Sequence, residues 1–333
     1  MIDLHLHLDG SLTPEDIITL ADIEGVELPT RDKKELRKYL VFDGADRTLT
    51  HYLTYFDLPI SVMQSKETVS KAVELLVSRL ARQGMIYAEI RFAPLLHTKK
   101  GLTIEEVTES AIDGLRRGVG DGKFAAQLIL CCMRRVATPE QNMETVECVK
   151  KYLGKGVCAV DLAGDEVDFG YEDYKEVFDK VKAYGLPCTI HAGERGGVAE
   201  IETAIKLGAE RIGHGVHIAD SEELVDKIER LGIGVEMCPT SNYQTGAIED
   251  IKDYPIRKYI EKGIHVCVNT DSTVVSDTSV MREFDFLKRE IGLTIEEKVK
   301  CFLNAVRISF APDSFKDILR MRIIAGLARI SEN

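Results

Sequence analysis

The segment Ile2-Asp3-Leu4-His5-Leu6-His7-Leu8-Asp9-Gly10-Ser11 decides how the rest of the chain is interpreted. Its alternation of apolar and polar residues predicts a β-strand, in which residues two apart point to the same side. His5 and His7 therefore share one face, and two imidazoles at this spacing can bind one metal ion. Paired histidines also lie on solvated strand faces, so the downstream sequence must decide between the two interpretations.

Seven further apolar runs follow, and amphipathic segments separate them. The runs span 85–94, 124–133, 157–164, 187–194, 211–218, 233–240 and 264–271. Helical periodicity is expected over 67–83, 104–118, 139–153, 171–184, 199–207 and 221–231. Together with the first strand, these eight alternations predict the α/β class and a closed (β/α)8 TIM barrel. A doubly wound open sheet is the alternative.

Residues 13–83 contain helical patterns but no convincing strand. Thr13-Pro14-Glu15-Asp16 offers an N-cap, a proline at the first helical position and acidic residues in the first turn. Helices are also predicted over 31–40 and 48–63. We therefore expect a helical insertion after strand 1, at about residues 13–65, that forms a lid. The sequence has no linker or composition shift, which predicts a single domain over residues 1–333.

Composition narrows the class of protein. Of the 333 residues, 44% are hydrophobic and 29% are charged, and no apolar run has the length of a membrane span. The N-terminus lacks the basic and apolar regions of a signal peptide, so we expect a cytoplasmic protein. A net charge of -12 opposes binding to nucleic acid or anionic lipid. None of the eight cysteines forms a Cys-x-x-Cys pair, which favours buried, reduced thiols.

Polar residues cluster where the predicted strands end. The strand ends carry Asp161-Leu162-Ala163-Gly164-Asp165-Glu166, His191-Ala192-Gly193-Glu194, Gly213-His214-Gly215-Val216-His217, Cys238-Pro239-Thr240-Ser241-Asn242 and Asn269-Thr270-Asp271-Ser272. Five of the eight histidines lie at strand ends, whereas His51, His97 and His265 do not share the pattern. Because the active sites of such barrels lie at the carboxyl ends of the strands, we expect these side chains to form one site.

The residue types in this group predict a metal centre. His5, His7, His191 and Asp271 make a nitrogen-rich set that suits one zinc ion and leaves a position for water, although iron or manganese could be held by the same ligands. A divalent ion lowers the pKa of bound water toward neutrality. His214 is the candidate base, or alternatively a residue that orients a ligand. Glu194, beyond its strand end, is a candidate acid or a solvated loop glutamate.

Taken together, these motifs closely resemble the adenosine deaminase family, and the likeness runs from the first strand to the eighth. The resemblance implies a zinc (β/α)8 barrel that hydrolyses adenosine and 2'-deoxyadenosine to inosine and 2'-deoxyinosine, with release of ammonia. It implies one zinc ion on His5, His7, His191 and Asp271. It also implies Glu194, His214 and Asp271 as catalytic residues: Glu194 protonates purine N1, and His214 helps to deprotonate and stabilise the attacking water.

The resemblance further implies a set of substrate contacts. These are His7, Asp9, Gly164, Ser272, Leu49, Tyr52, Leu53, Phe56 and Met133. Asp9 would bind the ribose 5'-hydroxyl and Gly164 would donate to N3, while plain core packing is an equal alternative for the apolar members. Ser272 departs from the family, which commonly has an aspartate there that binds N7. A serine can still donate to N7 or act through water, and Thr273 replaces a common proline.

Other members of the superfamily are alternatives. Adenine deaminases tend to carry Glu at the position of Asp9, and deaminases of N6-methylated AMP tend to carry Asn, so Asp9 favours a small purine nucleoside as the partner. Binuclear amidohydrolases need a lysine at the end of strand four, where 161–164 has none. A barrel that binds nucleosides without catalysis is the alternative from another class. The preferred 6-aminopurine, the metal in the cell and the oligomeric state stay open.

Overall fold

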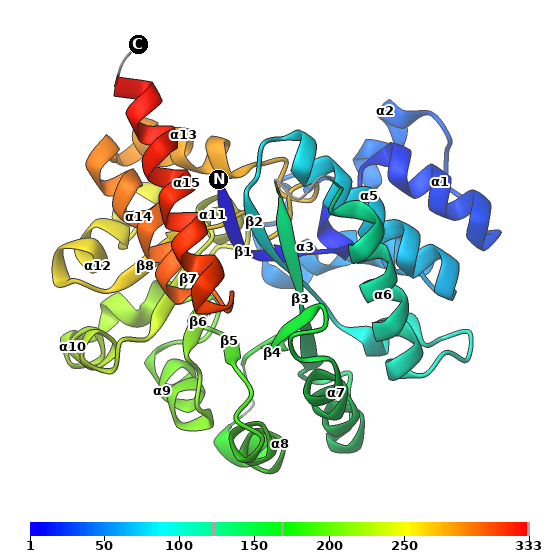
Figure 1. Ribbon diagram of the computed structural model, residues 1–333, viewed down its shortest axis with the longest axis horizontal. Helices are drawn as coiled ribbons and strands as arrows, with labels where there is room; N and C mark the ends of the chain where they lie inside the picture. The colour runs from blue at the N-terminus through cyan, green and yellow to red at the C-terminus, as the bar shows by residue number, and fades with distance from the viewer. Residues whose placement is uncertain (121–123, 168–169, 332–333) are drawn as a thin grey trace.

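The computed structural model describes residues 1–120, 124–167 and 170–331, and its core is an eight-stranded parallel sheet with the sequential order β1 to β8. The strands are β1 (Ile2–His7), β2 (Tyr87–Phe92), β3 (Ala125–Met133), β4 (Val157–Ala163), β5 (Cys188–Ala192), β6 (Arg211–His214), β7 (Gly234–Met237) and β8 (His265–Val268). Figure 1 shows the strands with helices around them. The predicted (β/α)8 barrel is confirmed. The open-sheet alternative is wrong, because each strand pairs with its neighbours in sequence.

The ring is joined where β1 meets the segment that follows β8. The backbone N–H of His7 donates to the carbonyl of Asp271 at 2.7 Å, and the N–H of Asp271 donates to the carbonyl of His5 at 2.8 Å. The N–H of Leu4 donates to the Asn269 side chain at 2.9 Å. β1 is therefore held on both edges, by β2 on one side and by residues beyond β8 on the other.

Helices cover the outside of the barrel. They are α5 (Lys66–Arg82), α6 (Ile104–Gly118), α7 (Pro139–Tyr152), α8 (Tyr171–Ala183), α9 (Val198–Leu207), α10 (Glu222–Leu231), α11 (Pro239–Gln244), α12 (Ile256–Lys262), α13 (Val280–Ile291), α14 (Ile295–Ile308) and α15 (Asp313–Ser331). In α5, the side chain of the N-cap Ser65 accepts from the N–H of Thr68. The apolar positions predicted for this helix are buried, namely Val69, Val73, Leu76, Val77 and Leu80, so burial of one face holds the helix on the sheet.

The helical insertion after β1 is present, but its helices are shorter than predicted. It contains α1 (Pro14–Glu24), α2 (Lys33–Leu36), α3 (Leu49–Leu53) and α4 (Asp57–Ser61). The single helix expected over 48–63 is wrong, because a 3₁₀ turn at Thr54–Phe56 divides it. Pro59 has no N–H to donate to the preceding turn, which explains why α4 does not continue α3. The prediction over 31–40 begins too early, since Asp32 caps α2.

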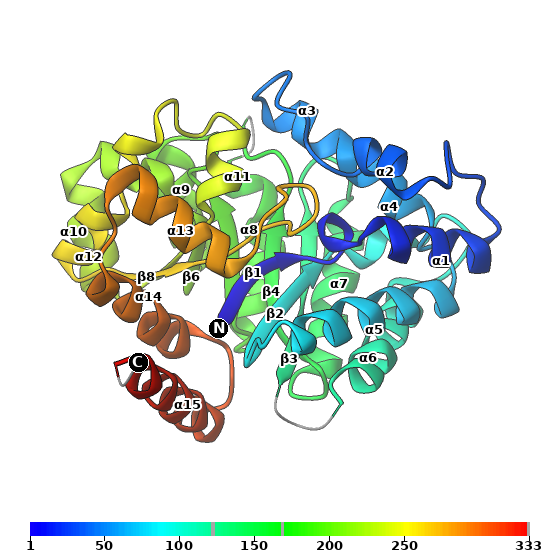
Figure 2. The ribbon, with the colours of Figure 1, turned by 90° about the horizontal axis from the view of Figure 1, so that it is seen from above.

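The two ends of the barrel differ in what covers them. α15 packs near the N-terminus, and Leu319 and Ile323 form a buried cluster with Ile2, Leu4 and Tyr87. Figure 2 shows α3 and α11 at the opposite end of the barrel from α15. All eight cysteines are buried and free. Among the described residues, no helix is both long and apolar enough to cross a membrane.

The close packing of α5 on α6 generates a stability prediction. A Cβ atom at Gly114 would lie 2.0 Å from the carbonyl oxygen of Ser70, so Gly114→Ala must push the two helices apart. We expect a loss of about 1–3 kcal/mol, measured by thermal or denaturant unfolding. Gly326→Ala is the matched control, since a Cβ there meets nothing within 4 Å. Alanine is the better helix former, so the control should be neutral or stabilising. Equal losses in both variants would contradict this packing argument.

Candidate active site

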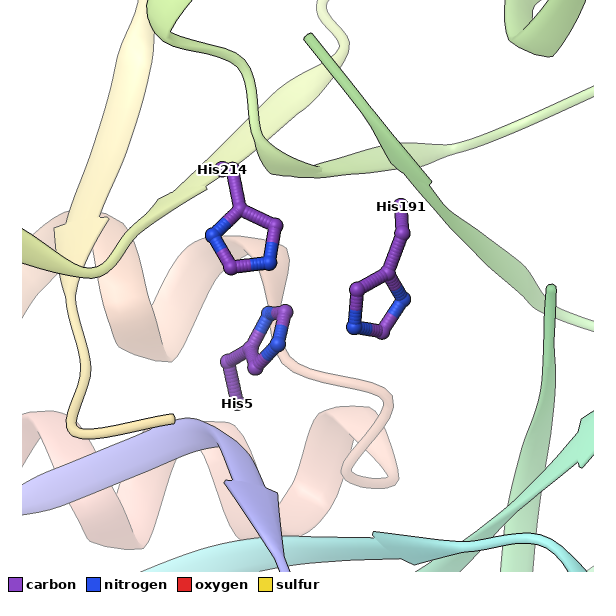
Figure 3. A group of neighbouring side chains, drawn as sticks. All are labelled: His5, His191 and His214. Atoms are coloured by element: carbon purple, nitrogen blue, oxygen red, sulfur yellow. The ribbon is translucent and has the colours of Figure 1, made fainter. Parts of the chain in front are cut away.

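Four histidines meet at the carboxyl end of the barrel, and we call them the imidazole cluster: His5, His7, His191 and His214. Figure 3 shows the rings of His5, His191 and His214 lying close together. Their centroids are 4.6 Å apart for His5 and His191, and 4.8 Å apart for His5 and His214. The Nε2 atoms of His7 and His191 are 3.2 Å apart. Burial lowers the pKa of His5, His7 and His214 well below the usual value, which favours the neutral, ligating form.

Asp271, which follows β8 and pairs with β1, lies beside the imidazole cluster. Its Oδ1 lies 3.4 Å from Nε2 of His7 and 3.7 Å from Nε2 of His5, and Ser241 donates to its Oδ2 at 2.5 Å. Asp271 and His214 both have left-handed backbone conformations, with φ of 59° and 66°. Such strain in residues other than glycine is common at functional sites. The fold thus aims both side chains into the same space.

The donor atoms of this group fit a bound metal ion. Ligand atoms of His5, His7 and Asp271 lie within 4.8 Å of one another, as do those of His5, His191 and His214. Nε2 of His5 is buried and has no hydrogen-bond partner. An unpartnered buried nitrogen is unfavourable, and a cation bound among these atoms would satisfy it. The structure therefore brings the four predicted ligands together, with His214 beside them.

A buried ionic network stands behind the imidazoles. Nδ1 of His5 is 2.8 Å from Glu236, and Nδ1 of His191 is 3.1 Å from Asp161. Arg91 joins the two carboxylates, with contacts of 2.7 Å to Glu236 and 3.1 Å to Asp161. These carboxylates fix the Nδ1 side of each ring, so Nε2 faces the metal position.

The charges in this network are set by their neighbours. Burial alone would raise the carboxyl pKa values, but His191 and Arg91 hold the pKa of Asp161 below its ordinary value. Arg91 and Arg211 likewise lower the pKa of Glu236 to about 2. Both carboxylates are thus ionised near neutrality. Sequence reasoning missed Arg91 and Glu236, although charged residues inside otherwise apolar strands were a signal of a paired interior charge.

Glu194 faces His214 across the cluster, with 3.5 Å between Oε2 and Nε2. Burial, followed by the nearby charge of Asp271, raises the pKa of Glu194 well above the usual value, which favours the protonated form of this carboxyl. Its loop is anchored by Glu166, whose carboxylate accepts from the backbone N–H groups of Gly193, Glu194, Arg195 and Gly196. Glu166 is a third residue whose role the sequence did not reveal.

Asn242 determines which nitrogen of His214 carries the proton. Its amide oxygen accepts from the Tyr254 hydroxyl at 2.8 Å, so its nitrogen donates to Nδ1 of His214 at 2.9 Å. A neutral ring that accepts at Nδ1 carries its proton on Nε2. His214 therefore presents an N–H to the space beside Glu194.

A cavity of about 280 Å³ opens in front of this group. Its lining includes most of the predicted substrate contacts, namely His7, Asp9, Leu49, Tyr52, Leu53, Phe56, Met133 and Gly164. Asp9 is buried, its Oδ1 has no partner, and burial raises its pKa to about 6. Ser272 is fully buried and is absent from the lining. It packs against Gly10, where an added Cβ would lie 2.2 Å from the serine oxygen.

The remaining histidines lie away from the cluster. His217, the fifth histidine at a strand end, pairs with Asp220 at 2.8 Å. His51 contacts Asp43, and His97 contacts the carbonyl of Met63. His265 begins β8 and so lies at the amino end of the barrel. The rule that functional histidines lie at strand ends thus identified the four histidines of the imidazole cluster. It also selected His217, which lies outside the cluster.

Comparisons with known proteins point to one family for the chain. The family model described as adenosine deaminase matches residues 1–326. The chain is 39% identical over 327 residues to a Haemophilus ducreyi protein named adenosine deaminase, covering 97% of this chain and 95% of that one. It resembles the solved structure of an adenine deaminase from Arthrobacter aurescens, with a TM-score of 0.88, 26% identity and 98% coverage of both chains. It also resembles Arabidopsis ADAL complexed with IMP, with a TM-score of 0.84, 26% identity and coverage of 97% and 96%.

The donor set generates a prediction about metal content. We expect His191→Ala to lose the bound ion, because the variant lacks a nitrogen at the centre of the group. His265→Ala, at the other end of the barrel, is the matched control and should keep the ion. Metal per chain can be measured by plasma mass spectrometry after dialysis against a chelator. Retention of the ion by His191→Ala would show that the metal is held elsewhere.

Proposed function

The chain belongs to the adenosine deaminase family, and from that premise we propose that it hydrolyses adenosine and 2'-deoxyadenosine to inosine and 2'-deoxyinosine, with release of ammonia. One observation carries the proposal: the buried carboxyl of Glu194 lies 3.5 Å from His214 and lines the same cavity of about 280 Å³ as His7, His191 and Asp271, and its pKa is raised well above the usual value. An acid and an activated water on the same small ring are what hydrolysis of an aromatic amine requires.

We propose one zinc ion per chain as the cofactor, held by His5, His7, His191 and Asp271. When bound, such an ion lowers the pKa of a bound water toward neutrality and so supplies the nucleophile. The nitrogen-rich donors and the unpartnered Nε2 of His5 support this assignment.

The residues of the chain have distinct proposed roles in the reaction. The Glu194 carboxyl donates its proton to purine N1, which removes aromatic stabilisation and makes C6 electrophilic. His214 orients the attacking water through its Nε2–H. Because that nitrogen already carries a proton, we assign the proton that the water loses to the Asp271 carboxylate and not to His214, the base that the sequence suggested. Addition of water to C6 then gives a tetrahedral carbon. Asp271 passes the proton that it took from the water to the 6-amino nitrogen, ammonia leaves, and the proton of the C6 hydroxyl returns to Glu194 as the C6 carbonyl forms. The overall reaction consumes one water per nucleoside.

Substrate recognition is proposed for the residues around the cavity. Asp9, with its unpartnered oxygen, accepts a hydrogen bond from the ribose 5'-hydroxyl, and the N–H of Gly164 donates to N3. Leu49, Leu53 and Phe56 cover the base and sugar. Because Ser272 lies behind the wall, we propose that it reaches N7 only through a bridging water. The base edge is therefore recognised less directly than an aspartate at this position would allow.

A substrate panel tests the activity. We expect ammonia release from adenosine and 2'-deoxyadenosine, little ammonia from adenine, and little methylamine from N6-methyl-AMP. Preferential turnover of adenine would instead favour the alternative of a 6-aminopurine deaminase that acts on the free base. A metal-loaded protein that released neither ammonia nor methylamine from any of these compounds would favour a barrel that binds nucleosides without catalysis.

Glu194→Gln tests the proposed acid. Glutamine is nearly isosteric but has no carboxyl proton to transfer, so we expect kcat to fall by about 100-fold or more while the bound metal is retained. Glu202→Gln, in the ion pair between Glu202 and Lys227 on the surface, is the matched control and should keep its activity. Wild-type kcat in Glu194→Gln would remove the acid assignment.

The raised pKa of Glu194 also predicts a pH dependence. The acid acts in its protonated form, which is fully populated below the raised pKa and is lost as the pH rises through it. We therefore expect kcat/KM for adenosine to persist at neutral pH and to fall on the alkaline side. Rate measurements across the pH range check this expectation. A decline that began near the ordinary glutamate pKa would contradict it.

A further inference from the structure

One guanidinium connects the helical insertion to the end of α11 and to the segment that follows it. Arg47 donates from Nε to the carbonyl of Tyr243 at 2.7 Å and from a terminal nitrogen to the carbonyl of Ile248 at 2.7 Å. A longer contact of 3.5 Å reaches the carbonyl of Glu249. The guanidinium carbon also lies 3.8 Å from the centre of the Tyr243 ring. We call this set of contacts the Arg47 latch.

The backbones on the two sides of the latch are also in contact. A Cβ atom at Gly246 would lie 2.5 Å from the carbonyl oxygen of Arg47, and Gly246 has φ of +75°. Only glycine fits both the left-handed backbone and this close approach. The guanidinium contacts and the glycine contact are therefore two independent features of the same junction.

The latch connects the cover of the cavity to the segment beneath it. Arg47 precedes Thr48, the N-cap of α3, and α3 supplies Leu49, Tyr52 and Leu53 to the cavity lining. On the other side, α11 carries Ser241 and Asn242, which bind Asp271 and His214. Figure 2 shows α3 and α11 at the same end of the barrel.

The insertion is also anchored at a different edge, through Phe42 ahead of the latch and through Tyr52 within α3. The N–H of Phe42 donates to the carbonyl of Val275 at 2.9 Å, and the Tyr52 hydroxyl lies 2.8 Å from that of Ser276, both beyond β8. Residues 43–46, which lie between Phe42 and Arg47, are exposed. Arg47 thus attaches the start of α3 to the side of the cavity formed after β7.

We propose that Arg47 is a positioning residue for deamination: it holds α3 closed over the bound nucleoside and thereby sets how tightly the nucleoside is retained, without touching it. Arginine suits this task because its planar fork can bind two carbonyls while its face stacks on an aromatic ring, which a lysine ammonium cannot do. The kinetic consequence rests on the proposed function. The structural consequence, an attached α3, does not.

The test compares Arg47→Ala with three other variants. Apparent affinity falls in proportion to the closed fraction, so we expect Arg47→Ala to raise KM for adenosine about tenfold, with kcat changed by less than about twofold. Amide hydrogen exchange in Leu49–Leu53 should become faster. Arg47→Lys should lie between the wild type and Arg47→Ala. Gly246→Ala, which disturbs the junction from the other side, should resemble Arg47→Ala.

Arg31→Ala is the matched control. It removes the same side chain from the same insertion, but Arg31 only pairs with Asp22 at an exposed position, where ion pairs contribute little. KM and exchange in α3 should therefore stay at wild-type values.

Two outcomes would overturn the proposal: wild-type KM and wild-type exchange in Arg47→Ala, or a fall in kcat with KM unchanged. If Arg47→Ala does not fold, Gly246→Ala and Arg47→Lys decide by the same measurements. If the wild-type protein releases no ammonia from nucleosides, the proposed function fails. The exchange experiment then still decides whether Arg47 holds α3 in place.

Discussion

The pairing of β1 with the segment beyond β8 is the constraint on which the molecule depends. His5 and His7 exchange backbone hydrogen bonds with Asp271, and the side chains of the same three residues are three of the four candidate metal ligands. Closing the barrel and assembling the ligands are therefore one event. Residues near the two ends of the chain cannot reach one ion unless all eight strands have paired in order. Correct folding is thus a condition for metal binding, and a bound ion would in turn stabilise the closed ring.

The interior network of Arg91, Glu236 and Asp161 is better explained by its orientation of two imidazole rings than by a contribution to the stability of the fold. Three charges with no exposed side-chain surface lose their hydration, and a well-packed apolar core of the same volume is often as stable or more so. Removal of one partner, however, leaves an uncompensated charge, at a cost of about 3–5 kcal/mol. The network therefore ties the direction of two imidazoles to the integrity of the barrel. Glu166 does the same for the Glu194 loop through four backbone N–H groups.

The sequence predicted the features that depend on local patterns of residues. It did not show the contacts that depend on how neighbouring strands are aligned. Branched apolar runs placed eight strands, and the polar residues at their ends placed His191, Glu194, His214 and Asp271, because parallel strands end at one face. The partners Arg91 and Glu236 are 145 residues apart, and only the stagger of the strands shows that they meet. Pro59 was visible in the sequence, yet the helical periodicity on both sides of it hid the break between α3 and α4. The position of Ser272 behind the cavity wall needed the packing of Gly10, which no motif describes.

The burial of all eight thiols has a practical consequence. Burial also raises the thiol pKa, at Cys132 and Cys267 among others, so the reactive thiolate is scarce as well as hidden. Alkylating reagents should then modify only chains that have unfolded, at least locally. The rate of labelling therefore measures the rate of unfolding. Four of the cysteines lie on four different strands, namely Cys131, Cys158, Cys188 and Cys267. Mass spectrometry of the labelled peptides could therefore report which strands of the barrel separate first.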